Sequence, residues 1–120
     1  MVQAVVKDES VTQWVTVCSL ADIQPNTGVC ALLEDEQVAI FRVGESDRLY
    51  ALSNYDPFSK AYVLSRGIIG DRQGTIKVAS PIYKQNFNLE TGECLDDESV
   101  KIATFPVRVV EEQVQLSTIA

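Results

Sequence analysis

The sequence contains no histidine, and this absence excludes more functions than any other feature of its composition. Without imidazole there is no Ser-His-Asp or Cys-His nucleophile arrangement and no imidazole-ligated metal site. Cysteine is scarce as well, since Cys18, Cys30 and Cys94 are widely spaced and no two of them form a C-x-x-C pair. We therefore expect reduced, partly buried thiols, with a disulfide or a reactive thiol as the alternative.

The chain also has few basic residues and no long apolar run. The chain has 10 lysines and arginines against 17 acidic residues, and its formal net charge of −7 disfavours binding to a nucleic-acid backbone. Its apolar runs fall far short of the roughly 20 residues that cross a bilayer. The start, MVQAVVKDESVTQW, lacks the basic and then apolar segments of a signal peptide. We expect a cytoplasmic protein with neither a nucleic-acid nor a membrane partner.

What the chain does contain is enough apolar material for one core, at 46% hydrophobic residues over a length of 120. β-Branched and aromatic residues dominate short runs that are separated by turn residues, which favours strands. The expected strands are 14–19, 28–33, 37–43, 48–53, 75–80, 87–89, 105–111 and 113–117, with a tight hairpin between the last two. Strands of this number and spacing predict an all-β fold, either an antiparallel sandwich or a small barrel.

Three segments stand outside this strand pattern. Residues 1–12 mix charge with valine, and we expect a tail or an added edge segment there, followed by a single domain over 13–120. Ser19 and Asp22 predict one capped helical turn. The segment 54–74 is expected to be a long irregular loop, and its apolar content favours packing or contact with a partner over disorder.

Two polar loops follow expected strands, Asn54-Tyr55-Asp56 and Ser80-Pro81-Ile82-Tyr83, and NFNLETG comes soon after the second. Their order resembles a Rieske-type domain, which holds a [2Fe–2S] cluster with C-x-H in one loop and C-x-x-H in the next. The resemblance spans roughly Trp14 to Leu116 and implies a Rieske-like fold. It places Asn54 and Ser80 at the cysteine positions, and Asp56 and Tyr83 at the histidine positions.

The chemistry of these four vestigial ligand positions argues against a cluster. A Rieske cluster takes two thiolates on one iron and two imidazoles on the other. An amide, a carboxylate, a hydroxyl and a phenol cannot replace all four, because iron bound to sulfide favours soft thiolates. A calcium or magnesium site usually gathers more carboxylates or waters than these loops offer. We expect no metal on this chain, and side chains that hydrogen-bond the two loops together.

Four segments carry a closer resemblance, to the small subunit of the cytoplasmic NAD(P)H-dependent nitrite reductase. They are GVCALLEDEQVAIFRV, NYDPFSKAYVLSRGIIGD, VASPIYKQNFNLETGECL and FPVRVVEEQVQL. The resemblance implies a large-subunit partner that carries FAD, siroheme and a [4Fe–4S] cluster and reduces nitrite to ammonium. It also implies that this chain belongs to an oxidoreductase but is itself non-catalytic and without a cofactor. Its expected role is assembly or positioning.

The segments DPF and LSRG are candidates for the contact surface with that partner, because aromatic residues and arginine are favoured at the centres of interfaces. Lys84 and Gln85, at the tip of the second loop, are candidates in the same region, with an ordinary solvated turn as the alternative. In full, the candidates are Asp56, Pro57, Phe58, Leu64, Ser65, Arg66, Gly67, Lys84 and Gln85. The alternative for DPF and LSRG is that Phe58 and Leu64 pack into the core while Arg66 pairs with an acid.

Two other functions remain open at this point. One is a ferredoxin-like electron carrier with unusual ligands, which would show visible absorption and stoichiometric iron. The other is a stand-alone β-domain that binds a small molecule or another protein at the vacated cluster cavity, which would show ligand-dependent thermal stabilisation.

Overall fold

The computed structural model describes residues 13–46 and 48–117, so the expected N-terminal segment 1–12 and the last three residues of the expected domain lie outside it. The elements in chain order are β1 (Trp14–Ser19), η1 (Leu20–Asp22), β2 (Thr27–Leu33), β3 (Glu36–Arg42), β4 (Leu49–Ser53), β5 (Tyr55–Asp56), β6 (Ala61–Tyr62), η2 (Leu64–Arg66), β7 (Ile68–Arg72), β8 (Thr75–Ala79), β9 (Asn86–Asn88), β10 (Thr104–Phe105), β11 (Val107–Val110) and β12 (Gln113–Ser117). Within the described ranges, neither helical turn comes close to the length and hydropathy of a membrane span.

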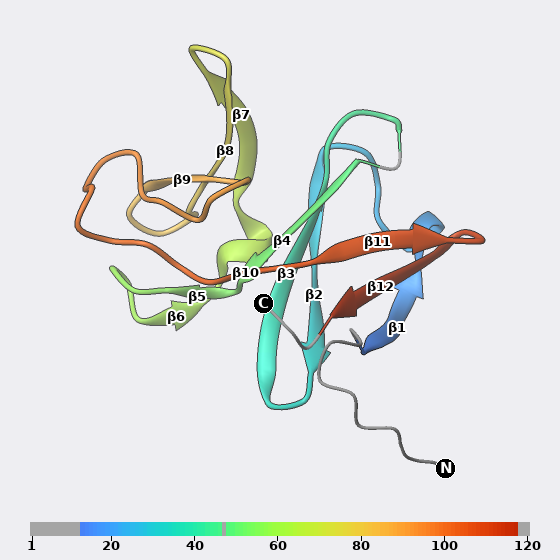
Figure 1. The fold of residues 1–120 in the computed structure, drawn as a ribbon. Helices are drawn as coiled ribbons and strands as arrows, with labels where there is room; N and C mark the ends of the chain where they lie inside the picture. The colour runs from blue at the N-terminus through green and yellow to red at the C-terminus, as the bar shows by residue number, and fades with distance from the viewer. Residues whose placement is uncertain (1–12, 47, 118–120) are drawn as a thin grey trace.

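The strands form four sheets, in the orders β1-β12-β11, β10-β4-β3-β2, β5-β6 and β7-β8-β9. Every pairing between them is antiparallel, and the all-β prediction is therefore confirmed. In Figure 1 the first two sheets occupy the centre and right of the molecule, whereas β5–β6 and β7–β9 form a separate part on the left.

Strand β3 lies between two cores, because its successive side chains point to opposite sides. Val38 and Ile40 join the core between the β1-β12-β11 sheet and the four-stranded sheet. Ala39 and Phe41 join the core that Val78 and other residues of the β7-β8-β9 sheet complete on the opposite side. Burial on both faces explains why this strand reads as the continuous apolar run VAIF.

Two predicted turns are confirmed. Ser19 begins η1 with a capping box, in which its hydroxyl accepts from the Ala21 amide and Asp22 accepts from the Ser19 amide. The C-terminal hairpin turns at Glu111 and Glu112, which have φ values of 51° and 68°. Positive φ at both central residues is typical of a type I′ turn, whose twist matches that of the flanking strands.

Two strand predictions need correction. The segment 54–74 is not an irregular loop, since it contains β5, β6, η2 and β7, and β7 pairs with β8 along its whole length. The expected strand 105–111 is divided at Pro106, where β10 pairs with β4 and β11 pairs with β12. Proline has no amide hydrogen to donate to a ladder, which suits a point where the chain passes from one sheet to another.

Candidate functional site

A buried hydrogen bond between Asp56 and Ser80 joins the two loops. The Ser80 hydroxyl donates to Asp56 Oδ2 over 2.5 Å, and both residues are fully buried. The same carboxylate accepts from the Ser59 hydroxyl at 2.9 Å and from the Phe58 amide at 2.9 Å. Asp56 therefore accepts three hydrogen bonds, one of which crosses from the second loop to the first.

These hydrogen bonds keep Asp56 ionised. Burial is the largest single influence on this carboxyl, and alone it would raise the pKa. The hydrogen bonds from Ser80, Phe58 and Ser59 together outweigh it, so the pKa lies below its ordinary value of 3.8. At neutral pH the two loops thus meet at the ionised carboxylate of Asp56, and its three hydrogen-bond donors are groups of the protein itself.

Asn54 has a different set of partners, all outside the second loop. Its side-chain oxygen accepts from the Ser65 amide at 2.7 Å. Its side-chain nitrogen donates to Gln37 Oε1 at 3.2 Å and lies 3.5 Å from the Cys30 sulfur. Asn54 therefore fixes the turn η2 against the edge of the four-stranded sheet, and does not bridge the loops.

Cys30 is a further neighbour of Asn54, although nothing in the sequence marks the two as close. It lies 24 residues before Asn54, and the pairing of β2, β3 and β4 brings the two together. Burial raises the pKa of its thiol. Cys30 is nevertheless exposed, not partly buried as expected, and a thiol with a raised pKa has little thiolate at neutral pH, which disfavours nucleophilic attack.

Tyr83 does not join the hydrogen bonds of the other three positions. Its side chain is 62% exposed at the tip of the second loop. The loop is closed by its own backbone, with the Lys84 amide donating to Ser80 and the Ser80 amide donating to Gln85. The expectation that the four side chains hydrogen-bond the loops together thus agrees with the structure for Asp56 and Ser80, and is wrong for Asn54 and Tyr83.

The candidate contact residues divide by exposure. Asp56 and Leu64 are fully buried and cannot belong to a contact surface in this fold, since Leu64 packs in the core with Phe41. Phe58 is half-buried and packs against Phe87, with ring centroids 6.2 Å apart. Pro57, Ser65, Gly67 and Gln85 are half-buried, whereas Arg66 and Lys84 are exposed.

Exposed apolar side chains surround the same loops. Tyr62, Ile68, Ile82 and Tyr83 are four of the seven large hydrophobic residues that are exposed in the described part of the chain. They come from β6, the start of β7 and the tip of the second loop. The apolar content of 54–74 is visible in the sequence, but which side chains face outward is not. Strands β5 and β6 have only two residues each, and Gly70 and the charged residues after it interrupt the apolar run of β7.

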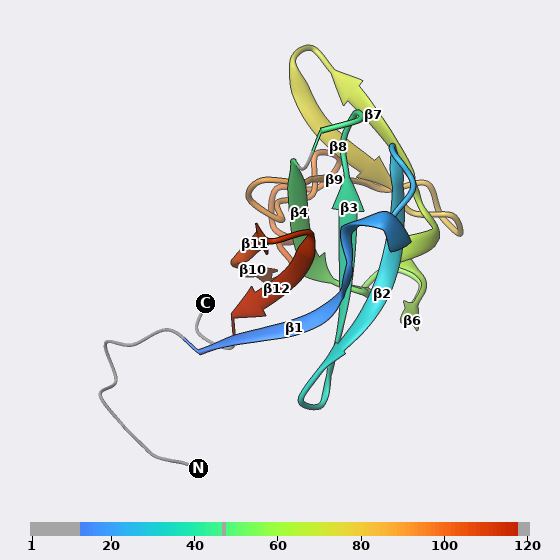
Figure 2. The ribbon, with the colours of Figure 1, turned by 90° about the vertical axis from the view of Figure 1, so that its right-hand side faces the viewer.

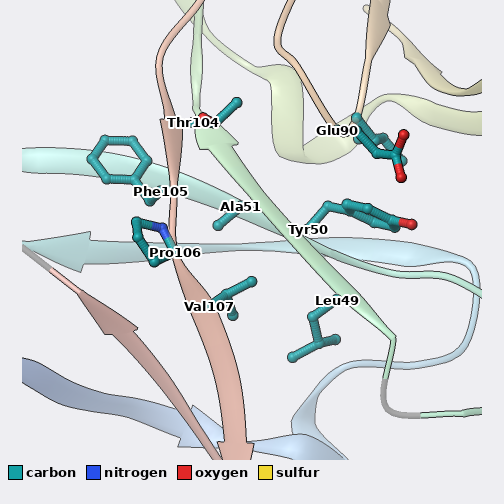
Figure 3. A pocket seen from close by; sticks show the side chains of 9 residues that line it. Leu49, Tyr50, Ala51, Glu90, Thr104, Phe105, Pro106 and Val107 are labelled. Carbon is teal, nitrogen blue, oxygen red and sulfur yellow. The ribbon is translucent and has the colours of Figure 1, made fainter. Parts of the chain in front are cut away.

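A groove of about 270 Å³ lies elsewhere, between β4 and the segment that contains β10 and β11. Figure 3 shows Phe105 and Pro106 on one side of it and Tyr50 and Glu90 on the other. None of the four residues Asn54, Asp56, Ser80 and Tyr83 lines this groove. It therefore gives no support to a binding site in a vacated cluster cavity.

The four positions do not fit a [2Fe–2S] cluster of the Rieske type. They supply an amide, a carboxylate, a hydroxyl and a phenol, where such a cluster takes two thiolates and two imidazoles. Three of these groups are already engaged in hydrogen bonds within the protein. In residues 13–46 and 48–117, moreover, no three His, Cys, Asp or Glu side chains come together as a metal site would require.

Comparison with known proteins identifies the family. The chain matches the Rieske-like [2Fe-2S] domain family over residues 13–117. It is also 51% identical over 105 residues to the nitrite reductase (NADH) small subunit of Escherichia coli strain K12, a match that covers 88% of this chain and 97% of that protein. The chain belongs to the nitrite reductase small subunits. This assignment confirms the predicted Rieske-like fold and makes the chain a subunit of an oxidoreductase whose partner is a large subunit.

Two further relatives of this small subunit are informative. The NMR structure of the E. coli protein NirD superposes with a TM-score of 0.85 at 49% identity, covering 92% of this chain and 100% of that one. The nitrite reductase [NAD(P)H] large subunit of Klebsiella oxytoca is 42% identical over 96 residues, which are 80% of this chain and 10% of that protein. The Klebsiella large subunit therefore contains a segment that is similar to this small subunit.

Proposed function

We propose that this chain is a non-redox small subunit, which assists the reduction of nitrite to ammonium without carrying an iron–sulfur cluster. The observation that carries the proposal is the buried hydrogen bond between Asp56 and Ser80. It joins the loops at two of the residues that the resemblance to Rieske domains matches to cluster ligands. A carboxylate with three protein donors is already satisfied and has no need of a metal to stabilise its charge.

On this proposal the redox groups lie on the large subunit, which carries FAD, siroheme and a [4Fe–4S] cluster and reacts with NAD(P)H in the cytoplasm. The small subunit contributes assembly or positioning. The fused arrangement in Klebsiella oxytoca supports close association, because there the two parts belong to one polypeptide. The exposed Tyr62, Ile82, Tyr83 and Lys84 around the loops suit a contact surface, since large aromatic side chains bury much area on binding.

The proposal is tested by the iron content of the isolated chain. We expect protein made anaerobically with ample iron to be colourless, with far less than one iron or sulfide per chain, because the loops lack thiolate and imidazole ligands. A Rieske ferredoxin prepared in parallel shows that the procedure preserves clusters. About two irons and two sulfides per chain, with visible absorption, would contradict the proposal and restore the electron-carrier hypothesis.

A further inference from the structure

Arg66 differs from the other arginines in having no partner among residues 13–46 and 48–117. Of the five arginines of the chain, four are engaged. Arg42 donates to backbone carbonyls, Arg48 to the Tyr50 hydroxyl, Arg72 to Asp96 and Arg108 to Gln115. Arg66 is exposed, and among the described residues its guanidinium makes neither a hydrogen bond nor an ion pair. What distinguishes Arg66 from the other arginines is therefore that no described residue accepts a hydrogen bond from its guanidinium, on a chain of net charge −7.

Arg66 lines a groove of about 370 Å³ between two sheets. One wall consists of Asn26 and the first two residues of β2, Thr27 and Gly28. The other wall runs from Ser65 to Ile69. Figure 2 shows the upper end of β2 beside the lower end of β7, where these two walls meet. The groove is therefore built from the edges of two different sheets.

The backbone around Arg66 is held in place by its packing. A side chain at Gly67 would put its Cβ 2.4 Å from the Ala79 carbonyl oxygen, and one at Gly28 would put its Cβ 2.8 Å from the Ser65 carbonyl oxygen. The side-chain oxygen of Asn54 accepts from the Ser65 amide at 2.7 Å. The turn that carries Arg66 is thus fixed before any partner arrives, which lowers the entropy lost on binding.

The walls of the groove suit an extended polypeptide. β2 and β7 are each the outermost strand of their sheet, so each has one edge whose backbone groups are not used in strand pairing. Ile68 lies two residues after Arg66. It is 73% exposed and is the most exposed large hydrophobic residue of the described chain. An added strand gains backbone hydrogen bonds from such an edge, and side-chain contacts decide its specificity.

We propose that this groove binds an extended segment of the large subunit, in which a carboxylate side chain pairs with Arg66 and an apolar side chain packs on Ile68. The guanidinium offers paired donors that match the two oxygens of a carboxylate. This inference rests on the proposed function, because it names the place where the small subunit holds its partner.

The test is the affinity of the small subunit for the purified large subunit, measured at low and at high ionic strength. We expect Arg66→Glu to raise the dissociation constant at least about tenfold at low salt, because it replaces the attraction to a carboxylate with repulsion. Ile68→Ser should weaken binding at both ionic strengths. Arg108→Glu makes the same charge change on β11, and should leave the affinity within about twofold. Circular dichroism and melting curves check that each variant is folded.

The outcomes separate this inference from the proposed function. In one outcome the Arg66→Glu and Arg108→Glu variants bind the large subunit with equal affinity while the wild-type chain binds it tightly. That result would overturn the binding of the large subunit in the groove and leave the subunit role intact. Failure of the wild-type chain to bind the large subunit would overturn both. Self-association of the wild-type chain that Arg66→Glu abolishes, with unchanged affinity for the large subunit, would assign the groove to a second copy of this chain and overturn the inference.

Discussion

Asp56→Ala is expected to lower the free energy of unfolding by about 2–4 kcal/mol, because it leaves buried donors without an acceptor. The Ser80 hydroxyl, the Ser59 hydroxyl and the Phe58 amide all lose the partner that they share in the wild-type chain. Ser80 is fully buried and cannot recover its hydrogen bond from water. Urea denaturation of the two proteins, followed by circular dichroism, measures the difference.

Asp97→Ala is the matched control. Asp97 accepts from the hydroxyl and the amide of Ser99 at 2.6 Å and 3.0 Å, much as Asp56 accepts from its neighbours. It is exposed, however, and water replaces the carboxylate when the side chain is removed. We expect no measurable change in the midpoint for Asp97→Ala. If both variants lost stability equally, burial of the loop junction would not be what makes Asp56 important.

The ionisation of Asp56 also makes the free energy of unfolding depend on pH in the acidic range. The pKa of Asp56 in the folded chain lies below its ordinary value of 3.8, so folding favours the ionised form. Its contribution to stability is therefore complete above pH 3.8 and is lost as the pH falls from there through the lower folded pKa. The difference in stability between the wild-type chain and Asp56→Ala should narrow over that range. A constant or widening difference would contradict the ionised state assigned to Asp56.

Gly67→Ala is expected to destabilise the fold by about 1–3 kcal/mol through overpacking. The new Cβ would lie 2.4 Å from the Ala79 carbonyl oxygen and 2.7 Å from a methyl group of Val78, both of which belong to the neighbouring strand β8. A backbone oxygen within a ladder cannot move away without breaking the pairing of β7 with β8. The midpoint of thermal unfolding, compared with that of the wild-type chain, measures the effect.

Gly70→Ala, three residues further on, in β7, is the control. A Cβ there meets only the end of the Lys77 side chain, at 3.3 Å. Lys77 Nζ donates to Asn86 Oδ1 at 2.7 Å, but a long side chain can shift by a few tenths of an ångström far more easily than a backbone oxygen. Replacing glycine where the backbone allows it reduces the entropy of the unfolded chain, so this variant should be as stable as wild type or slightly more stable. The pair also distinguishes packing from partner contact at LSRG. Gly67→Ala would keep wild-type stability and lose only affinity for the large subunit if contact were its role.

Much of the fold follows from local pattern. The runs at 14–19, 75–80 and 113–117 are long enough to show strand composition, and β1, β8 and β12 lie where these runs predict them. The helix cap at Ser19 and the C-terminal turn depend only on residues that are close in sequence, so a short stretch of sequence is enough to predict them. Strands β5 and β6 have two residues each and show no periodicity, and β7, with the sequence IIGDR, has a glycine and two charged residues in place of strand-favouring ones. The sequence therefore indicated only a loop at 54–74.

The candidate site was predictable where it depended on residue type, and unpredictable where it depended on distant pairing. The order of polar residues at 54, 56, 80 and 83 marked the two loops, and the chemistry of the side chains argued against a cluster. The contact between Asn54 and Cys30 depends on the register of three strands. The burial of Asp56 and Leu64, which removes them from the contact surface, likewise depends on residues distant in sequence. Leu64 packs in a core with Val78 and Phe87, and Asp56 accepts a hydrogen bond from Ser80.

The most direct test of the central claim is a titration of the large subunit from the same source with iron-free small subunit, followed by NADH-dependent nitrite reduction. If the small subunit acts by assembly or positioning, activity should rise with added iron-free chain and reach a plateau. Activity that responds only to small subunit loaded with iron and sulfide, or that ignores the small subunit altogether, would contradict a non-redox supporting role.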